Sequence, residues 1–143
     1  MFYISHRGNL EGVNPKDENR PDYVINALNN NFHVEVDTWL IKDSFFLGHD
    51  NPEYPVNIEF IKNKNLWFHA KNINAFHKLL KLKVICFWHQ NDDVTLTSNG
   101  FIWTYPGKEL TQDSICVLPE INNIEKVNCA GICSDYIMKY SNE

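Results

Sequence analysis

Short apolar runs rich in β-branched and aromatic residues recur along the whole chain, and they restrict its possible folds more than any other feature. Each run is followed by polar or turn residues and often by a segment with helical spacing. Several runs are apolar throughout, which is typical of parallel strands that are covered on both faces. The predicted strands are 2–6, 33–39, 66–70, 83–88, 101–104, 115–118 and 131–134.

Helical segments are predicted between some of these runs. A helix over 21–28 opens with a proline, which suits a first helical turn. A second helix over 74–82 has an apolar stripe beside lysines, and a third, shorter one covers 56–62. Asp43 marks a turn, after which the second strand folds back as a hairpin.

Alternating strands and helices predict a right-handed α/β fold on a parallel sheet. Because a dinucleotide glycine fingerprint is lacking, we predict a compact, reduced TIM-type (β/α) barrel of about seven to eight mostly parallel strands with shortened outer helices. Such a barrel normally needs about 250 residues. This chain has 143, so several outer helices must be reduced to turns or loops. We predict one domain over 1–143, since a chain of this length and 43% hydrophobic content can bury its own core.

Charge and hydropathy exclude several classes of partner. The formal net charge is −5 and the lysines are scattered singly, so we expect no nucleic-acid partner. The first residues lack a basic region followed by a long apolar run, and no stretch approaches the length that spans a bilayer. We therefore expect a soluble, cytoplasmic protein without a membrane span.

Polar clusters fall where four of the expected strands end. In a parallel barrel the carboxyl ends of the strands share one face, so the four clusters are expected to converge on one pocket. The clusters are Ser5-His6-Arg7-Gly8, Glu35-Val36-Asp37, Gly48-His49-Asp50 and His69-Ala70-Lys71.

The carboxylate pair Glu35 and Asp37 indicates a metal site. The two residues are two apart on a strand, so both side chains point to the same side. Two carboxylates buried together repel unless one is protonated or a cation lies between them, and such oxygen ligands suit Mg²⁺, Ca²⁺ or Mn²⁺. The alternative is a strand face with two solvated acids. The neighbouring clusters favour the metal.

Basic side chains in the other clusters point to phosphate chemistry. His6 and His49 each follow a strand, and an imidazole can exchange protons with a reacting oxygen near neutral pH. Arg7 offers a planar fork for phosphate oxygens, and Lys71 adds a second positive charge. The pattern predicts a site for one phosphate group.

The order of these residues resembles the glycerophosphodiester phosphodiesterase family, within the phosphatidylinositol-phosphodiesterase-like TIM-barrel superfamily, as an unusually short member. The combination is specific although each piece alone is weak. The resemblance covers about the first fifty residues firmly, and the ending Ser134-Asp135 resembles the Thr-Asp pair of the family's last strand. The matching motifs are His6-Arg7-Gly8, Glu18-Asn19, Glu35-x-Asp37 and His49-Asp50.

The resemblance implies metal-dependent hydrolysis of a small-molecule phosphodiester, such as a glycerophosphodiester of lipid metabolism. In that mechanism a hydroxyl of the substrate attacks first, and water then opens the resulting cyclic phosphate. The implied roles are acid and base for His6 and His49, phosphate binding for Arg7 and Lys71, orientation of Arg7 for Glu18, and metal binding for Glu35 and Asp37.

One departure from the family pattern concerns the third strand, where Glu-x-Lys is usual and this chain has His69-x-Lys71. If His69 binds the metal, the preference shifts toward Mn²⁺, Zn²⁺ or another transition metal. If it does not, the third ligand is missing. Three functional hypotheses follow: an active phosphodiesterase of this kind, a catalytically impaired barrel that binds a phosphate ester or a lipid headgroup, or an unrelated cyclic-nucleotide or lipid-headgroup phosphodiesterase on the same scaffold.

Aromatic residues of the later strands are expected mainly in the core. Trp103, in the segment Trp103-Thr104-Tyr105-Pro106-Gly107, is the best candidate for a contact with substrate. His89 is a further candidate for the site, whereas His33 and His77 are expected to be structural or exposed.

Overall fold

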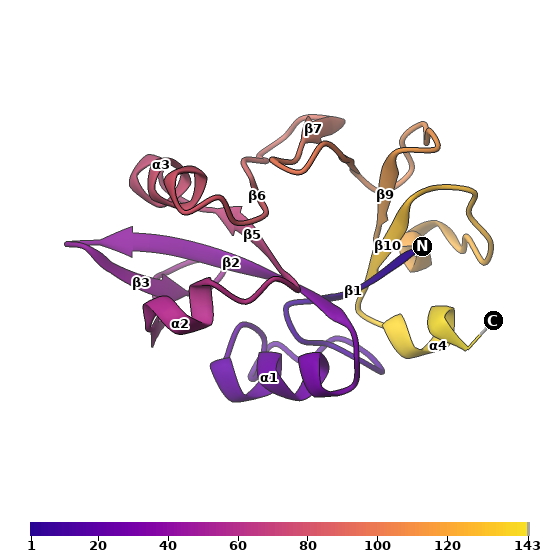
Figure 1. Cartoon of the computed structure of the whole chain (residues 1–143). Helices are drawn as coiled ribbons and strands as arrows, with labels where there is room; N and C mark the ends of the chain where they lie inside the picture. Colours follow the sequence, from indigo (N-terminus) through magenta and orange to yellow (C-terminus); the bar gives the residue numbers. More distant parts are fainter. Residues whose placement is uncertain (143) are drawn as a thin grey trace.

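The computed structural model describes residues 1–142, and within them a ten-stranded sheet forms the body of the molecule (Figure 1). The strands are β1 (Phe2–His6), β2 (His33–Ile41), β3 (Ser44–Leu47), β4 (Tyr54–Val56), β5 (Leu66–Ala70), β6 (Cys86–Phe87), β7 (Val94–Leu96), β8 (Ile102–Thr104), β9 (Ser114–Val117) and β10 (Gly131–Ser134). The helices are α1 (Pro21–Asn29), α2 (Ile58–Ile61), α3 (Ile73–Lys81), α4 (Ile137–Ser141) and the 3₁₀ helix η1 (Pro119–Asn122).

The predicted TIM-type barrel is wrong, because the sheet is mixed and helices do not alternate with its strands. Parallel ladders join β6, β5, β2, β1, β10, β9 and β8 in that order. Antiparallel ladders join β2 to β3, β3 to β4 and β7 to β8. The crossover from β8 to β9, through residues 105–113 of the described chain, contains no helix at all. The three helices predicted over 21–28, 56–62 and 74–82 are present as α1, α2 and α3, so the error lies in the strand pairing and in the crossovers without a helix.

Strand β2 organises the sheet because it pairs with three other strands. Its first half lies beside β1 and its second half beside β3, while β5 runs along the opposite edge. The return into β3 is a two-residue turn at Lys42 and Asp43, both with positive φ, which is the turn that matches strand twist in a hairpin. The predicted hairpin at Asp43 is confirmed.

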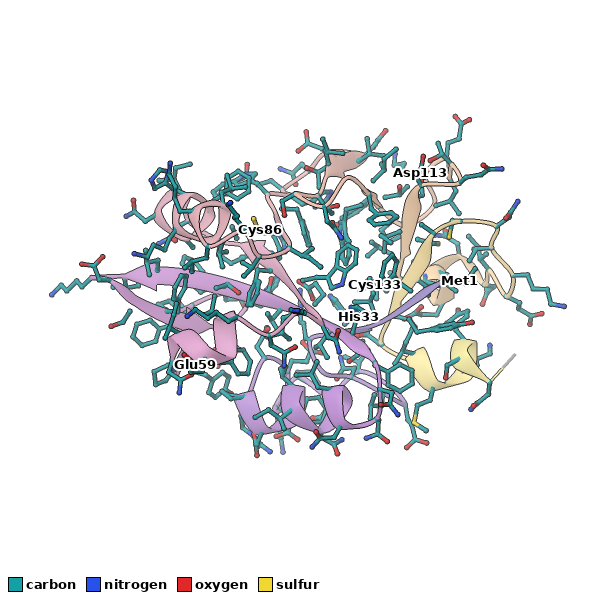
Figure 2. All side chains as sticks on the ribbon, viewed as in Figure 1. Met1, His33, Glu59, Cys86, Asp113 and Cys133 are labelled. Atoms are coloured by element: carbon teal, nitrogen blue, oxygen red, sulfur yellow. The ribbon has the colours of Figure 1, made fainter. Side chains whose placement is uncertain are left out.

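The two faces of the sheet bury different groups. Val34 and Val36 of β2 pack with residues of α1 and α3 in one hydrophobic cluster. The alternate residues Glu35 and Asp37 point to the other face, as the period of two requires. That face carries a second, aromatic cluster on the inside of the curved sheet, where side chains fill the space between the strands (Figures 1 and 2). This cluster contains Ile4, Trp67, Phe87, Trp103, Ile115, Val117 and Cys133.

Several element boundaries agree with the sequence, and others do not. The strands predicted at 2–6, 66–70 and 131–134 are confirmed residue for residue. Strands β4 and β7 and helix α4 were not expected from the sequence, and β6 is shorter than predicted. Among residues 1–142, no helix combines the length and apolar character needed to cross a bilayer.

Candidate functional site

The end of β1 turns sharply and so places His6 and Arg7 beside the end of β2. Arg7 has φ 56° and Gly8 has φ 95°, both in the left-handed region that only glycine adopts freely. The backbone N–H of Arg7 donates to the carbonyl of Glu35 at 2.9 Å. The turn therefore carries both basic side chains to the carboxylates of β2.

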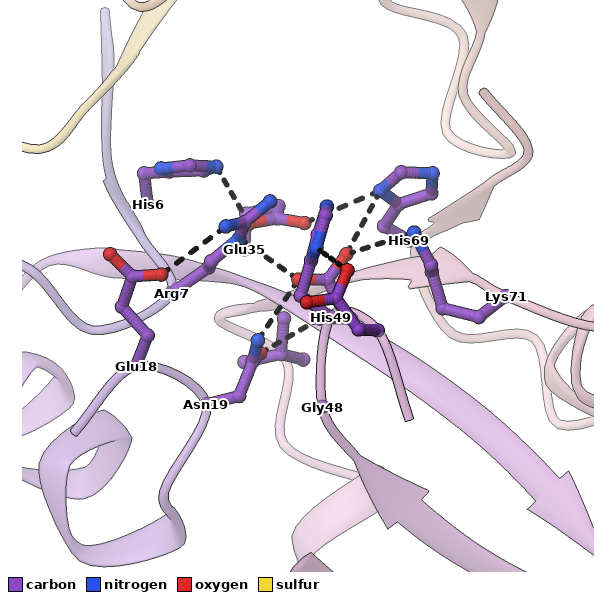
Figure 3. Close-up of polar contacts among 12 residues, drawn as sticks. His6, Arg7, Glu18, Asn19, Glu35, Gly48, His49, His69 and Lys71 are labelled. Carbon is purple, nitrogen blue, oxygen red and sulfur yellow. Dashed lines mark hydrogen bonds and ion pairs between the residues drawn. The ribbon is translucent and has the colours of Figure 1, made fainter. Parts of the chain in front are cut away.

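Parallel register places the acidic and imidazole groups side by side. His6 is opposite Glu35 in the β1–β2 ladder, and Asp37 is opposite His69 in the β2–β5 ladder. Glu35 and Asp37 are only 2% and 0% exposed. The Nδ1 atom of His69 lies 3.2 Å from Asp37 Oδ1 and 3.7 Å from Glu35 Oε1 (Figure 3).

The hydrogen bond of His69 to the backbone determines what its ring presents to these carboxylates. Nε2 donates to the carbonyl oxygen of His89 at 2.8 Å. In the neutral ring Nδ1 then has a lone pair, which faces Asp37 and Glu35 and is repelled by them. A proton on Nδ1 or a cation among the three groups removes this repulsion.

A divalent cation fits this group of three residues. Within the described chain, Glu35 Oε2 and Asp37 Oδ1 are buried without a hydrogen-bond partner, which is costly for carboxylate oxygens. One ligand atom from each of Glu35, Asp37 and His69 lies within 4.8 Å of the others. Two carboxylates and an imidazole suit Mn²⁺, Fe²⁺ or Zn²⁺ better than Ca²⁺, and the bond from His69 to a carbonyl is the usual support for a ligating histidine.

Asp37 is held by a second set of contacts. The side-chain amide of Asn19 donates to Asp37 Oδ2 at 2.9 Å, and the backbone N–H of Asp37 donates to Asn19 Oδ1 at 2.9 Å (Figure 3). Arg7 Nε lies 2.9 Å from Oδ2, although the direction of its N–H does not meet hydrogen-bond geometry. Lys71 Nζ is 3.7 Å from Oδ1.

The two carboxylates differ in their electrostatics. Burial raises the pKa of Asp37, but the close contact with His69 and the charge of Arg7 outweigh this and hold the pKa below its usual range. Burial and the neighbouring charge of Asp37 raise the pKa of Glu35. Asp37 is therefore the fixed anion of the pair, and Glu35 is the one that most needs a cation.

His6 is held at its other nitrogen by Asp135, which follows β10. His6 Nδ1 donates to Asp135 Oδ1 at 2.7 Å, so Nε2 is the atom left for proton exchange. Nε2 lies 3.9 Å from Glu35 Oε2. Burial lowers the pKa of His6, but the bond to Asp135 and the charge of Glu35 outweigh it and raise the pKa above its ordinary value.

Asn9 connects the supports of His6 and Arg7. Its side-chain amide donates to Asp135 Oδ1 at 2.8 Å and to Glu18 Oε1 at 2.9 Å. The other oxygen of Glu18 accepts from Arg7 Nη1 at 3.2 Å, so Glu18 contacts the side chain that it is expected to orient. Asn9 is fully buried.

His49 lies on the rim of the site, in the loop that follows β3. Gly48 has φ 149°, and an added Cβ would lie 2.0 Å from the carbonyl oxygen of Asn51. Gly48 is anchored to β2 because its N–H donates to the Asp37 carbonyl at 3.1 Å and its carbonyl accepts from Trp39 Nε1 at 2.7 Å. The Nδ1 atom of His49 bonds to Asp50 Oδ1 at 2.8 Å.

A cavity of about 520 Å³ brings most of the predicted site residues together. The cavity wall that carries them contains His6, Arg7, Glu35, His49, His69 and Lys71. Glu18 lines an adjoining hollow of about 390 Å³, which shares His6, Arg7 and His49. Asp37 lies beneath, in contact with Arg7, His69 and Lys71. The strand-end clusters thus converge, although the sheet is not the predicted barrel.

We expect Asp135→Asn to lower the pKa of His6 in the metal-free protein, because it removes the anion that accepts from Nδ1. The pKa is measured from the pH dependence of the His6 ring proton signals in NMR spectra. Asp113→Asn, at an exposed position, is the matched control and should leave the His6 titration where it was. An unchanged His6 pKa in Asp135→Asn would contradict the contact.

Comparisons with models of known protein families, with curated proteins and with solved structures returned no match. What the site can do is therefore argued from its own groups. Two of those groups, Asn9 and Asp135, received no role from sequence reasoning. The position of Asp135 after the last strand was a signal that could have found it, whereas Asn9 had no local signal beyond its place after Gly8.

Proposed function

We propose that this protein is a metal-dependent phosphodiesterase whose substrates carry a hydroxyl next to the scissile phosphate, as glycerophosphodiesters do. The observation that carries the proposal is that His6 and His49, each hydrogen-bonded to a carboxylate, line the same cavity as the cations Arg7 and Lys71. The buried metal-ligand group of Glu35, Asp37 and His69 adjoins this cavity. This combination matches the resemblance found in the first fifty residues. It also goes beyond it, because His69 and Asp135 lie outside that segment.

The two imidazoles are suited to opposite proton transfers. His6 bonds through Nδ1 to Asp135 and His49 through Nδ1 to Asp50, so each has Nε2 free to exchange a proton. Their surroundings differ, because the side chain of His6 is 14% exposed and that of His49 is 46% exposed. The His6 ring is therefore largely buried beside Glu35, and the His49 ring is exposed to solvent at the rim of the cavity.

The cavity needs added positive charge before an anionic diester can bind. The carboxylates that contact His6, Arg7 or Lys71 in and around the cavity outnumber the permanent cations: Glu18, Glu35, Asp37 and Asp135 against Arg7 and Lys71. A divalent ion held by Glu35, Asp37 and His69 would supply that charge and stabilise the phosphoryl oxygens as charge develops on them. Arg7 and Lys71 would orient the phosphate from the protein side.

The proposed reaction has two steps. In the first, one imidazole takes the proton of the substrate hydroxyl, whose oxygen attacks phosphorus. The bond from phosphorus to the leaving alcohol breaks, and the other imidazole gives that alcohol its proton. In the second, the two imidazoles exchange roles. One takes a proton from water, whose oxygen attacks phosphorus, and a P–O bond of the cyclic phosphate breaks. The other imidazole protonates the oxygen released from phosphorus.

The test is a screen of Mn²⁺, Zn²⁺, Mg²⁺ and Ca²⁺ against glycerophosphodiesters and a diester with no neighbouring hydroxyl, followed by ³¹P NMR. We expect hydrolysis that chelation abolishes and Mn²⁺ restores, with a cyclic phosphate as an intermediate and no reaction of the second substrate. Absence of hydrolysis with every metal would contradict the proposal. Tight binding without turnover would instead support a phosphate-ester binding protein.

A further inference from the structure

The part of the cavity wall that comes from the segments after β7 is apolar or aromatic except for Asn122. It is built from the ends of β8 and β9, the loop after β8, and η1. Its apolar and aromatic residues are Trp103, Tyr105, Pro106, Val117, Leu118 and Ile121. A cavity of about 520 Å³ is in the range that holds drug-sized ligands, so it has room for much more than a phosphate with a glycerol.

The aromatic part of this wall is rigid. Trp103 is 5% exposed and stacks on Phe87 at 4.4 Å between ring centroids, which fixes the floor. Tyr105 stacks on His89 at 5.0 Å with an interplanar angle of 18°, and His89 is itself fixed by a 2.8 Å bond from Nε2 to the Asp92 carbonyl. Yet Tyr105 remains 48% exposed. A flat face is therefore held open beside the cavity.

Leu118 is held in a strained backbone conformation. Its φ of 47° and ψ of 55° are left-handed, which is an outlier for a bulky residue that is not glycine. Its N–H donates to the Cys133 carbonyl at 2.7 Å. The strain keeps an apolar side chain on the cavity wall where asparagine or glycine would adopt the same backbone more easily.

Helix η1 joins this wall to the pair formed by His6 and Asp135. Glu120 Oε1 accepts from the backbone N–H of Asp135 at 2.9 Å, and Oε2 accepts from Ser134 Oγ at 2.9 Å. Ile121, the next residue, lines the cavity and is 62% exposed. The element that positions the partner of His6 therefore also presents an uncovered apolar side chain to the substrate space.

We propose that this apolar wall binds the leaving alcohol of the diester, and that this alcohol is an apolar group, aryl or alkyl, and not a second polyol. The identification of the bound group as the leaving alcohol rests on the proposed function. The preference of the wall for an apolar group does not depend on turnover. Burial of roughly 60 Å² of apolar ligand surface would strengthen binding by about tenfold.

The test compares the affinities of methylphosphonate monoesters of phenol, hexanol and glycerol, measured by isothermal titration calorimetry with Mn²⁺ present. These monoanions carry the charge of a diester but cannot pass through the cyclic route. We expect the wild type to bind the phenyl and hexyl esters about tenfold more tightly than the glyceryl ester. A tighter phenyl than hexyl ester would identify the aromatic face as the main contact.

Two variants locate the effect on the wall. Ile121→Asn and Leu118→Asn should each weaken binding of the apolar esters by about three- to tenfold and leave the glyceryl ester within about twofold. Asparagine tolerates the left-handed backbone, so Leu118→Asn retains the turn. Ile73→Asn on α3 is the matched control, because Ile73 is 67% exposed and lies outside the residues of this cavity; it should change none of the affinities.

Equal affinity of the wild type for the three esters, or no measurable binding of the apolar esters, would overturn the proposal. Variants that weaken all three esters alike would overturn it too, because they would indicate damage to the phosphate site. A preserved preference for apolar esters in a protein that hydrolyses no diester would leave the subsite standing and refute the proposed function. Hydrolysis of diesters without a preference for apolar esters would support the proposed function and refute the apolar subsite.

Discussion

His6→Ala is expected to reduce phosphodiester turnover by about 10²- to 10⁴-fold, the range that a positioned acid or base contributes. The variant removes the Nε2 atom that faces the cavity and leaves the groups around it in place. Asp135 retains its hydrogen bond from Asn9, so the loss of folding stability should be no more than about 1–3 kcal/mol. The measurement is kcat with Mn²⁺ and a glycerophosphodiester.

Two controls separate the chemistry of His6 from general damage. His77→Ala removes an exposed imidazole on α3 and should leave kcat unchanged. Free imidazole added to His6→Ala should restore part of the lost turnover, because the cavity is open to solvent-borne molecules of that size. Full activity in His6→Ala would refute the catalytic assignment, and activity lost in both histidine variants would point to misfolding instead.

Glu35→Gln and Asp37→Asn are both expected to abolish the binding of a divalent ion, but only Asp37→Asn is expected to destabilise the metal-free protein. Asp37 contacts Arg7 and Lys71, and its neutralisation leaves these cations without their buried anion. Removing one partner of a buried ion pair costs about 3–5 kcal/mol of unfolding free energy. We expect Asp37→Asn to lose that much in metal-free protein.

Glu35→Gln should have little effect on the metal-free protein or stabilise it. Burial and the charge of Asp37 raise the pKa of Glu35, and its Oε2 has no hydrogen-bond partner among residues 1–142. A neutral amide of the same shape relieves both costs, so its unfolding free energy should lie within about 1 kcal/mol of the wild type or above it.

Urea denaturation with EDTA and with Mn²⁺ checks both expectations. An ion at about 100 times its dissociation constant should stabilise the wild type by about 2.7 kcal/mol. Neither variant should gain stability from Mn²⁺. If Glu35→Gln gained as much as the wild type, the metal site would have to be placed elsewhere. If Asp37→Asn were as stable as Glu35→Gln without metal, the division of roles between the two carboxylates would be wrong.

The strands were predictable where a local pattern is enough. The apolar runs of β1, β5 and β10 gave their boundaries directly, and the turn at Asp43 gave the hairpin. The sheet topology was not predictable in the same way, and the predicted barrel is wrong. Residues 105–113 join two neighbouring parallel strands without a helix, and only the packing of the whole chain decides that they remain irregular.

The candidate site divides in a similar way. The two-residue period of β2 put Glu35 and Asp37 on one face, and strand-end positions brought in His6, His49 and His69. Asp135 accepts hydrogen bonds from His6 and Asn9, which lie 129 and 126 positions away. Its place after the last strand could have marked it as a site residue, but no local pattern could identify these partners. The tautomer of His69 likewise depends on a carbonyl twenty residues away.

The sequence by itself determined which residues alternate across β2 and which polar groups follow each strand, because these properties depend on backbone geometry over a few residues. Only the tertiary structure decided that the sheet is mixed, that η1 brings apolar side chains to the cavity, and that Asp135 and Asn9 support His6 and Glu18. Those features depend on contacts between distant segments, which form only where the whole chain packs.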